Sequence, residues 1–148
     1  MQHACTCAAL RKLTRTLTRL YDSHLSEAGM KTTQYSLLQT ITLESLPMAE
    51  LARRLSTERT TLTRNLKPLI DAGWVRLAAG ADARQRIVAI TPAGRAAIAA
   101  AHAAWRRAQT ALEVALGRAN VEELQRNAEL ALAILTPLVE RSPDVVEA

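Results

Sequence analysis

Residues 56–92 read STERTTLTRNLKPLIDAGWVRLAAGADARQRIVAITP, and within them a helical pattern gives way to a strand pattern. The first half spaces its apolar side chains for an amphipathic helix that is capped by Ser56 or Thr57 and ends at Gly73. Pro68 falls inside this helix and removes one backbone hydrogen bond, so we expect a bend or an early loosening of the last turn near it. The predicted apolar face consists of Leu62, Leu66, Leu69 and Ile70.

The second half of the same stretch predicts a β-hairpin joined directly to the helix. Residues 74–78 and 87–91 are short runs with apolar and β-branched side chains. The loop between them is small, polar and basic, with Gly80 at the turn. Thr91 and Pro92 then form a strong helix start, because a Thr side chain can cap a helix and Pro suits its first turn.

Helical patterns flank this stretch on both sides. The expected helices cover about 7–28, 33–43, 47–55, 57–72, 92–116 and 121–140. Pro47 opens the third of them, and Asn120, with Glu123 three residues later, is the expected cap of the last. The fold class is therefore predicted as mainly α, a winged helix-turn-helix with six helices plus a β-hairpin wing.

The positive charge of the chain is confined to its middle third. The net charge is +5, and residues 50–95 hold nine basic and four acidic side chains, whereas the rest of the chain holds ten of each. Such a local excess predicts a surface for a polyanion, with an ordinary solvated basic surface as the alternative.

The predicted helix 57–72 has the composition of a helix that enters the major groove of DNA. An Arg side chain can bind guanine or phosphate with two hydrogen bonds, and Thr hydroxyls reach phosphates. The residues opposite its leucines are Arg59, Thr60, Thr61, Thr63, Arg64 and Lys67. In the hairpin loop, Arg84 and Arg86 are predicted to contact DNA as a wing, with Asp82 orienting them through a salt bridge.

Several classes of protein are excluded by what the sequence lacks. The first twenty residues have no uninterrupted apolar core of a signal peptide, and no segment approaches the roughly 20 apolar residues that span a bilayer. No catalytic triad or Gly-rich phosphate loop can be assembled, and His3, His24 and His102 lie far apart without carboxylates at metal spacing. We therefore expect a cytoplasmic protein with no membrane partner, no catalytic residues, no metal site and no cofactor.

Several segments, in order, follow the running pattern of a known family. They are residues 49–55 (AELARRL), 60–69, 72–75 (AGWV), Asp82-x-Arg84 and 90–94 (ITPAG). With these segments the chain resembles the MarR family of bacterial transcription regulators over roughly residues 10–138. Pro68 is a departure from the pattern, because an ordinary helix former is commoner at that position.

The resemblance implies a homodimeric repressor that binds palindromic, double-stranded operator DNA, and that associates with the bacterial nucleoid when bound. Its one intertwined domain would comprise an N-terminal dimerisation helix (1–30), a winged helix-turn-helix DNA-binding lobe (31–95) and C-terminal dimerisation helices (96–148). The residues agree with a dimer, because a long helix pair with Ala-rich stripes and few aromatic side chains cannot bury its surface alone.

Many MarR-like regulators release DNA when a small aromatic acid or phenol binds between the dimerisation helices and the DNA-binding lobe. By this resemblance Tyr21, His24 and Tyr35 are the expected wall of an effector pocket, with Arg95 near its mouth. A protonated His24 could hold an anion. The alternative is that both tyrosines are packing residues and His24 is a surface histidine.

A second candidate sensor is the motif His3-x-Cys5-x-Cys7. Thiolates suit oxidants and soft metals, so Cys5 and Cys7 could make the chain a thiol-responsive or soft-metal-responsive repressor. The alternative is a frayed tail with incidental cysteines, which lie too close together to staple a fold. The remaining alternative for the whole chain is a winged-helix module that binds a protein. In such a module, substitutions in the basic face would leave the function intact.

Overall fold

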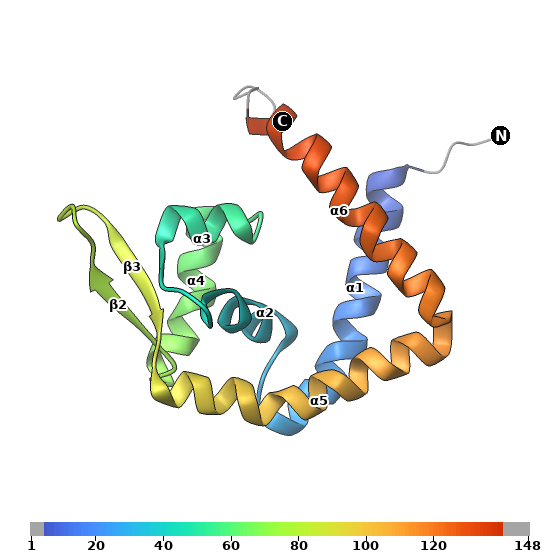
Figure 1. Cartoon of the computed structure of the whole chain (residues 1–148), viewed down its shortest axis with the longest axis horizontal. Helices are drawn as coiled ribbons and strands as arrows, with labels where there is room; N and C mark the ends of the chain where they lie inside the picture. The colour runs from blue at the N-terminus through green and yellow to red at the C-terminus, as the bar shows by residue number, and fades with distance from the viewer. Residues whose placement is uncertain (1–4, 141–148) are drawn as a thin grey trace. The chain divides into compact units, whose positions relative to one another are not determined.

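The computed structural model describes residues 5–140, and the chain forms two compact units, Met1–Ala108 and Gln109–Ala148. The elements in chain order are α1 (Thr6–Leu25), η1 (Ser26–Ala28), α2 (Thr32–Ile41), β1 (Leu46–Pro47), α3 (Met48–Arg54), α4 (Arg59–Asp71), β2 (Val75–Ala79), β3 (Arg86–Ile90), α5 (Pro92–Leu116) and α6 (Arg118–Glu140) (Figure 1). The predicted fold class, six helices with a β-hairpin wing, is confirmed.

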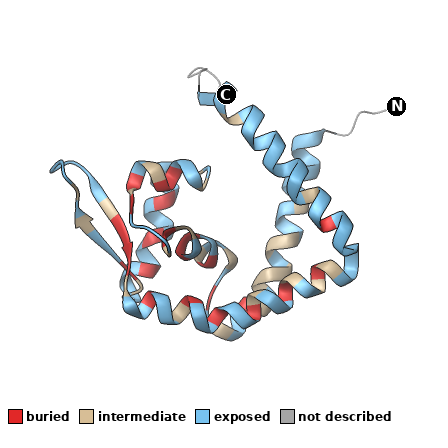
Figure 2. Ribbon diagram, viewed as in Figure 1, coloured by how far each residue is buried: buried red, intermediate tan, exposed pale blue. Residues whose placement is uncertain are grey.

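The core of the first unit is mostly aliphatic, and Tyr35 is its one buried aromatic side chain among the described residues. Fully buried leucines come from four helices, among them Leu25 of α1, Leu38 of α2, Leu51 of α3 and Leu66 of α4. Val88 of β3 joins them, so buried residues gather on α2, α4 and the base of the hairpin (Figure 2). Each such side chain contributes roughly 1.5–3 kcal/mol of transfer free energy.

The sheet has three antiparallel strands in the order β1-β3-β2, one more than the predicted hairpin. Leu46 pairs with Val88 and Pro47 with Ile87. Pro47 therefore ends an edge strand, where its missing N–H costs no ladder bond, and does not open a helix. The predicted helix start at Pro47 was wrong by one residue, since α3 begins at Met48.

The turn between α3 and α4 differs from the prediction. Ser56 has a φ of 47°, in the left-handed region, and α4 begins at Arg59 after Glu58. Neither Ser56 nor Thr57 caps α4, because the cap position falls at Glu58, one residue after Thr57. The helix then continues through Pro68 to Asp71, and Ala72 N donates to Pro68 O over 3.0 Å, so the expected early loosening was also wrong.

The second unit is formed by the end of α5 and by α6. Gly117 separates the two helices with a φ of 86°, and Val121 N donates to Gly117 O over 3.1 Å. Asn120 lies inside α6 and its Nδ2 donates to Leu116 O over 2.7 Å. The predicted cap at Asn120 was therefore wrong: the glycine starts the helix earlier, and the amide serves the preceding helix end.

Candidate nucleic-acid interface

The helix α4 separates an apolar face from a polar one. Leu62, Leu66 and Leu69 are fully buried, and α3 and β2 pack against this helix. The six predicted contact residues are all exposed: Arg59, Thr60, Thr61, Thr63, Arg64 and Lys67. Ile70 was predicted to belong to the apolar face, but it is 37% exposed and lies beside the polar one.

Two of the six side chains have partners within the chain. Thr63 Oγ1 donates to Arg59 O over 2.9 Å, so the hydroxyl can still accept a hydrogen bond. Lys67 Nζ donates to Asp71 Oδ2 over 2.8 Å. In the described part of the chain Arg59 and Arg64 form no ion pair, so both guanidinium groups are available to an anion.

The strands β2 and β3 form the wing, in a register that pairs Val75 with Ile90 and Ala79 with Arg86. Its loop closes through a bond from Gly80 N to Gln85 O of 2.9 Å. The tip of this hairpin reaches beyond the helices around it (Figure 1). Arg84 and Arg86 are exposed, as a wing that contacts DNA requires.

Asp82 shapes this loop by a different route from the one predicted. Its Oδ1 accepts the backbone N–H of Arg84 over 3.1 Å, and its carbonyl accepts that of Gln85 over 2.9 Å. This is an Asx turn, in which a short acidic side chain replaces a backbone acceptor. Asp82 therefore orients Arg84 through the backbone; among residues 5–140 it forms no salt bridge.

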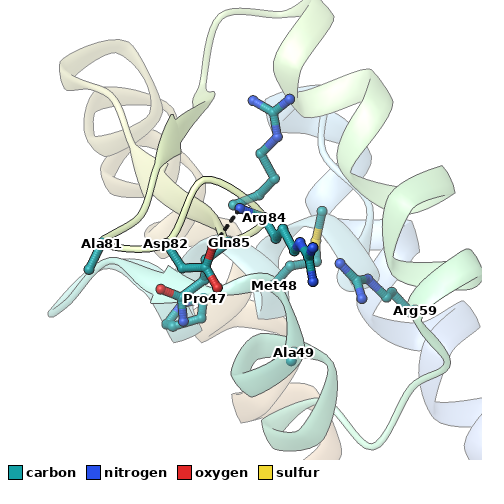
Figure 3. Close-up of a pocket in the computed structure, with 9 residues that line it drawn as sticks. Pro47, Met48, Ala49, Arg59, Ala81, Asp82, Arg84 and Gln85 are labelled. Carbon is teal, nitrogen blue, oxygen red and sulfur yellow. Dashed lines mark hydrogen bonds between the residues drawn. The ribbon is translucent and has the colours of Figure 1, made fainter.

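The wing and the helix-turn-helix together enclose a cleft of about 470 Å³. The start of α4 contributes Arg59, the wing contributes Arg84 and Arg86, and the floor is apolar at Pro47 and Met48. Figure 3 shows the Arg59 side chain directed from α4 toward the cleft, opposite the loop that carries Asp82. Guanidinium groups from two elements at one cleft can hold phosphate oxygens.

The start of α5 is tied to both the end of α4 and the wing. Thr91 Oγ1 accepts the N–H of Gly94 over 3.0 Å, which confirms the predicted cap, and donates to Gly73 O over 2.6 Å. Thr91 N also donates to Trp74 O over 2.9 Å. One threonine thus joins the C-terminal end of α4, the base of β2 and the first turn of α5.

An ion-pair network on α3 was missed by the sequence interpretation. Glu50 accepts hydrogen bonds from Arg53 and from Arg54, and Arg54 also pairs with Glu44 over 2.8 Å. The hydrogen bonds from Arg53 and then Arg54 hold the pKa of Glu50 at about 2, below its ordinary value of 4.5. The helical spacing of Glu50 to Arg53 and Arg54 was a signal that could have revealed this network.

The predicted effector residues are only partly brought together. Tyr35 and Arg95 line one hollow of about 250 Å³ with Gln39, Ile98 and His102. Tyr21 packs against the core, and His24 Nδ1 lies 3.0 Å from Leu20 O; neither lines this hollow.

Side chains of α5 complete the surroundings of Tyr35, and the sequence interpretation missed them. Tyr35 Oη lies 3.1 Å from His102 Nδ1, and its ring stacks on Trp105 at a centroid distance of 5.9 Å. Burial raises the pKa of Tyr35. Arg95 donates to Thr42 O over 2.8 Å, which fixes its guanidinium at the edge of the hollow.

Cys5 and Cys7 are exposed and free, at the cap and in the first turn of α1. His3 lies outside the described residues. Within residues 5–140 no group of three or more His, Cys, Asp or Glu side chains could hold a metal ion. In the same range no helix is long and apolar enough to cross a bilayer.

Comparison with known proteins agrees with this geometry. Residues 28–85 match the sequence model of the MarR family. The M. tuberculosis transcriptional regulator MosR, in a crystal structure with DNA, is 39% identical to the chain, and the match covers 86% of this chain and 98% of MosR with a TM-score of 0.72.

Two structures of E. coli MarR share the fold at lower identity. The apo form is 23% identical, covers 88% of this chain and 99% of its own, and has a TM-score of 0.71. A cysteine-to-serine mutant with operator DNA is 24% identical, and the match covers 84% of this chain and 91% of the mutant chain, with a TM-score of 0.75. A comparison with curated protein sequences finds no match. The near-complete alignment with MosR and the match to the family model show that the chain belongs to the MarR family of winged helix-turn-helix, DNA-binding transcriptional regulators.

Proposed function

We propose that the protein is a homodimeric repressor that reads a palindromic operator with α4 in the major groove and the wing in the adjacent minor groove. The observation that carries this proposal is the set of arginines with no ion pair in the described chain, Arg59 and Arg64 on α4 and Arg84 and Arg86 on the wing. Arg59 shares one cleft with both wing arginines, and Arg64 shares a hollow of α4 with Thr60 and Thr63. Side chains that can bind phosphates and side chains that can bind bases therefore lie at both sites.

Each element has a separate role in this proposal. Arg64 lies in the middle of the exposed face of α4, where a guanidinium can bind the edge of a guanine. Arg84 lies at the wing loop that Asp82 shapes, where a narrow minor groove concentrates negative potential. Arg59 and Arg86 share the cleft between these elements, where they would bind the DNA backbone. The regulator would act in the cytoplasm, on the nucleoid.

A second copy of the chain is the proposed cover of α6. The C-terminal half of this helix exposes large apolar side chains, each between 52% and 60%: Leu130, Leu132, Ile134, Leu135, Leu138 and Val139. Monomeric proteins rarely leave such a run open to water. A two-fold dimer would cover it and would supply two recognition helices for two half-sites. Sedimentation equilibrium tests this point, and a monomer at micromolar concentration would contradict it.

The DNA proposal is tested by fluorescence anisotropy on the protein's own upstream DNA against a scrambled duplex, across a salt series. Arg64→Ala and Arg84→Ala are each expected to weaken operator binding by about 1–3 kcal/mol. Arg106→Ala removes the same charge from an exposed position of α5 and is the matched control. Equal binding to both duplexes, or equal losses in all three variants, would favour the protein-interaction module instead.

For the effector we propose a small aromatic acid in the hollow beside Tyr35. Arg95 and His102 can hold a carboxylate, and Ile98 and Ala99 offer an apolar surface to a flat ring. Since Trp105 stacks on both Tyr35 and His102, its fluorescence reports occupancy. Benzoate should quench or shift this fluorescence and lower operator affinity, and Arg95→Ala should abolish both effects. No response to benzoate or to hydroxylated benzoates would refute this effector class.

The thiol-responsive alternative rests on the exposure of Cys5 and Cys7. Cys5 is the extended cap residue of α1 and Cys7 is the second residue of the helix, so both thiols lie at one exposed helix end, where an oxidant can reach them. Operator affinity after peroxide treatment, in the native chain and in Cys5→Ser, tests this alternative. An unchanged affinity in the oxidised native chain would exclude it.

As a member of a family of transcription regulators, the chain is not an enzyme.

A further inference from the structure

The one acidic side chain of α4 lies on the helix face opposite the buried leucines. Residues three, four or seven apart share a face of an α-helix, so Thr60, Arg64, Lys67 and Asp71 form a single stripe. All four are exposed, and all four line one hollow of about 450 Å³. A carboxylate therefore lies in the surface that is proposed to face a polyanion.

Asp71 engages one particular cation of that stripe. Its Oδ2 accepts a hydrogen bond from Lys67 Nζ over 2.8 Å, and the two side chains are 62% and 76% exposed. Arg64, one turn earlier, forms no ion pair among residues 5–140. An exposed pair of this spacing adds little to helix stability, so stabilisation of α4 is a weak reason for a carboxylate at this position.

The pair has a larger effect on binding to DNA. A Lys ammonium is a point charge on a flexible four-carbon stem, and it can reach a phosphate in many positions. A free Lys67 would therefore strengthen binding to every duplex, whatever its sequence, because phosphates occur at every step. Specificity is the difference between operator affinity and random-duplex affinity, and an element that lowers the second raises it.

We propose that Asp71 is a specificity-determining residue, which engages Lys67 and thereby withholds a sequence-independent phosphate contact. The inference rests on the proposed DNA-binding function of α4. On the operator, base contacts from Thr60 and Arg64 fix the position of the helix, and Lys67 adds little whether or not it is paired. On random DNA no base contact fixes the helix, so freeing Lys67 would raise the affinity for random DNA more than the affinity for the operator.

The test is Asp71→Asn, measured by anisotropy on an operator duplex and a random duplex of equal length across a salt series. Random-duplex affinity should rise about five- to tenfold near 0.1 M salt, and its log–log salt slope should steepen by about 1 per recognition helix. Operator affinity should rise by much less. Asp71→Glu keeps the charge within reach of Lys67 and should retain the wild-type ratio of operator affinity to random-duplex affinity.

Two controls separate this role from a general change in charge. Glu122→Gln removes a carboxylate from the Arg118–Glu122 pair of α6, which has the same spacing at 3.1 Å, and should leave the ratio unchanged. In a Lys67→Ala background, Asp71→Asn should have almost no effect. An equal rise on both duplexes, an unchanged random-duplex affinity, or a full effect without Lys67 would overturn the inference. Wild-type protein that does not prefer the operator would refute the proposed function itself, and the same titration detects this first.

Discussion

Replacing Gly94 by Ala tests how closely the start of α5 is joined to the DNA-binding lobe. A Cβ on Gly94 would lie 2.1 Å from the carbonyl oxygen of Trp74 and 2.8 Å from Cγ1 of Ile90. The first neighbour is backbone and cannot rotate away, so α5 and the base of β2 must separate before the contact reaches even 3.0 Å. The hydrogen bonds that Thr91 makes to Trp74 and Gly94 span this same contact.

The size of the effect follows from these contacts. Overpacking of a tight site costs about 1–3 kcal/mol, and each weakened backbone hydrogen bond adds roughly 1 kcal/mol. The better helix propensity of Ala offsets less than about 1 kcal/mol of this. The expected loss is therefore about 2–4 kcal/mol, which for a chain of this length lowers the melting temperature by roughly 5–15 °C.

Thermal unfolding followed by circular dichroism measures this loss at one fixed protein concentration, because a dimer melts at a temperature that depends on concentration. Gly29→Ala is the matched control: its φ of 67° strains an Ala, but no atom lies within 4 Å of the added Cβ. It should cost only about 1–2 kcal/mol. A Gly94→Ala protein that melts within about 2 °C of wild type, or above Gly29→Ala, would refute the reasoning.

Further predictions concern the core, the α3 network and the wing. Leu66→Ala should destabilise the fold by about 2–5 kcal/mol in urea titrations, whereas a loss below about 1 kcal/mol would mean that α4 packs loosely. The depressed pKa of Glu50 means that its carboxylate stabilises the fold fully above pH 4.5 and loses this effect as the pH falls toward about 2. In Glu50→Gln the urea midpoint should therefore change less with pH than in wild type between pH 4.5 and about 2. A variant whose urea midpoint falls as steeply as that of wild type over this range would contradict this. Asp82→Ala should loosen the wing loop and weaken DNA binding as Arg84→Ala does, while Asp82→Asn, which can still accept the Arg84 N–H, should bind like wild type.

Features that local chemistry determines were predictable from the sequence. The leucine spacing of α4, the two runs of the wing and the Thr91 cap each depend on neighbours a few residues away, and all three are present. The starts of helices were predicted less well. The position of Ser56 in a left-handed turn and the pairing of Pro47 with Ile87 depend on how α3 packs against the sheet, which residue spacing does not encode.

The hollow beside Tyr35 shows the same limit at a candidate site. Tyr35 and Arg95 were predicted, but their neighbour His102 is 67 residues from Tyr35 in the chain. Only the packing of α5 against α2 brings the imidazole to the phenol, so periodicity in either helix alone could not reveal it. Tyr21 and His24, which were predicted beside Tyr35, lie on α1, whose rotation about its axis the sequence left open.

Several basic side chains of the DNA-binding lobe are engaged within the chain, so fewer are left for DNA than the sequence suggests. Of the nine basic residues between 50 and 95, Arg53 and Arg54 are engaged by Glu50, Lys67 by Asp71, and Arg95 by the carbonyl of Thr42. Four of the others, Arg59, Arg64, Arg84 and Arg86, lie on α4 and the wing. If each of these four guanidinium groups displaces one condensed counterion, whether it binds in a groove or at a phosphate, a dimer would show a log–log salt slope of about −7 rather than the roughly −16 that all nine would give. The measured slope therefore distinguishes a lobe that binds through four selected arginines from one that binds through its whole positive charge.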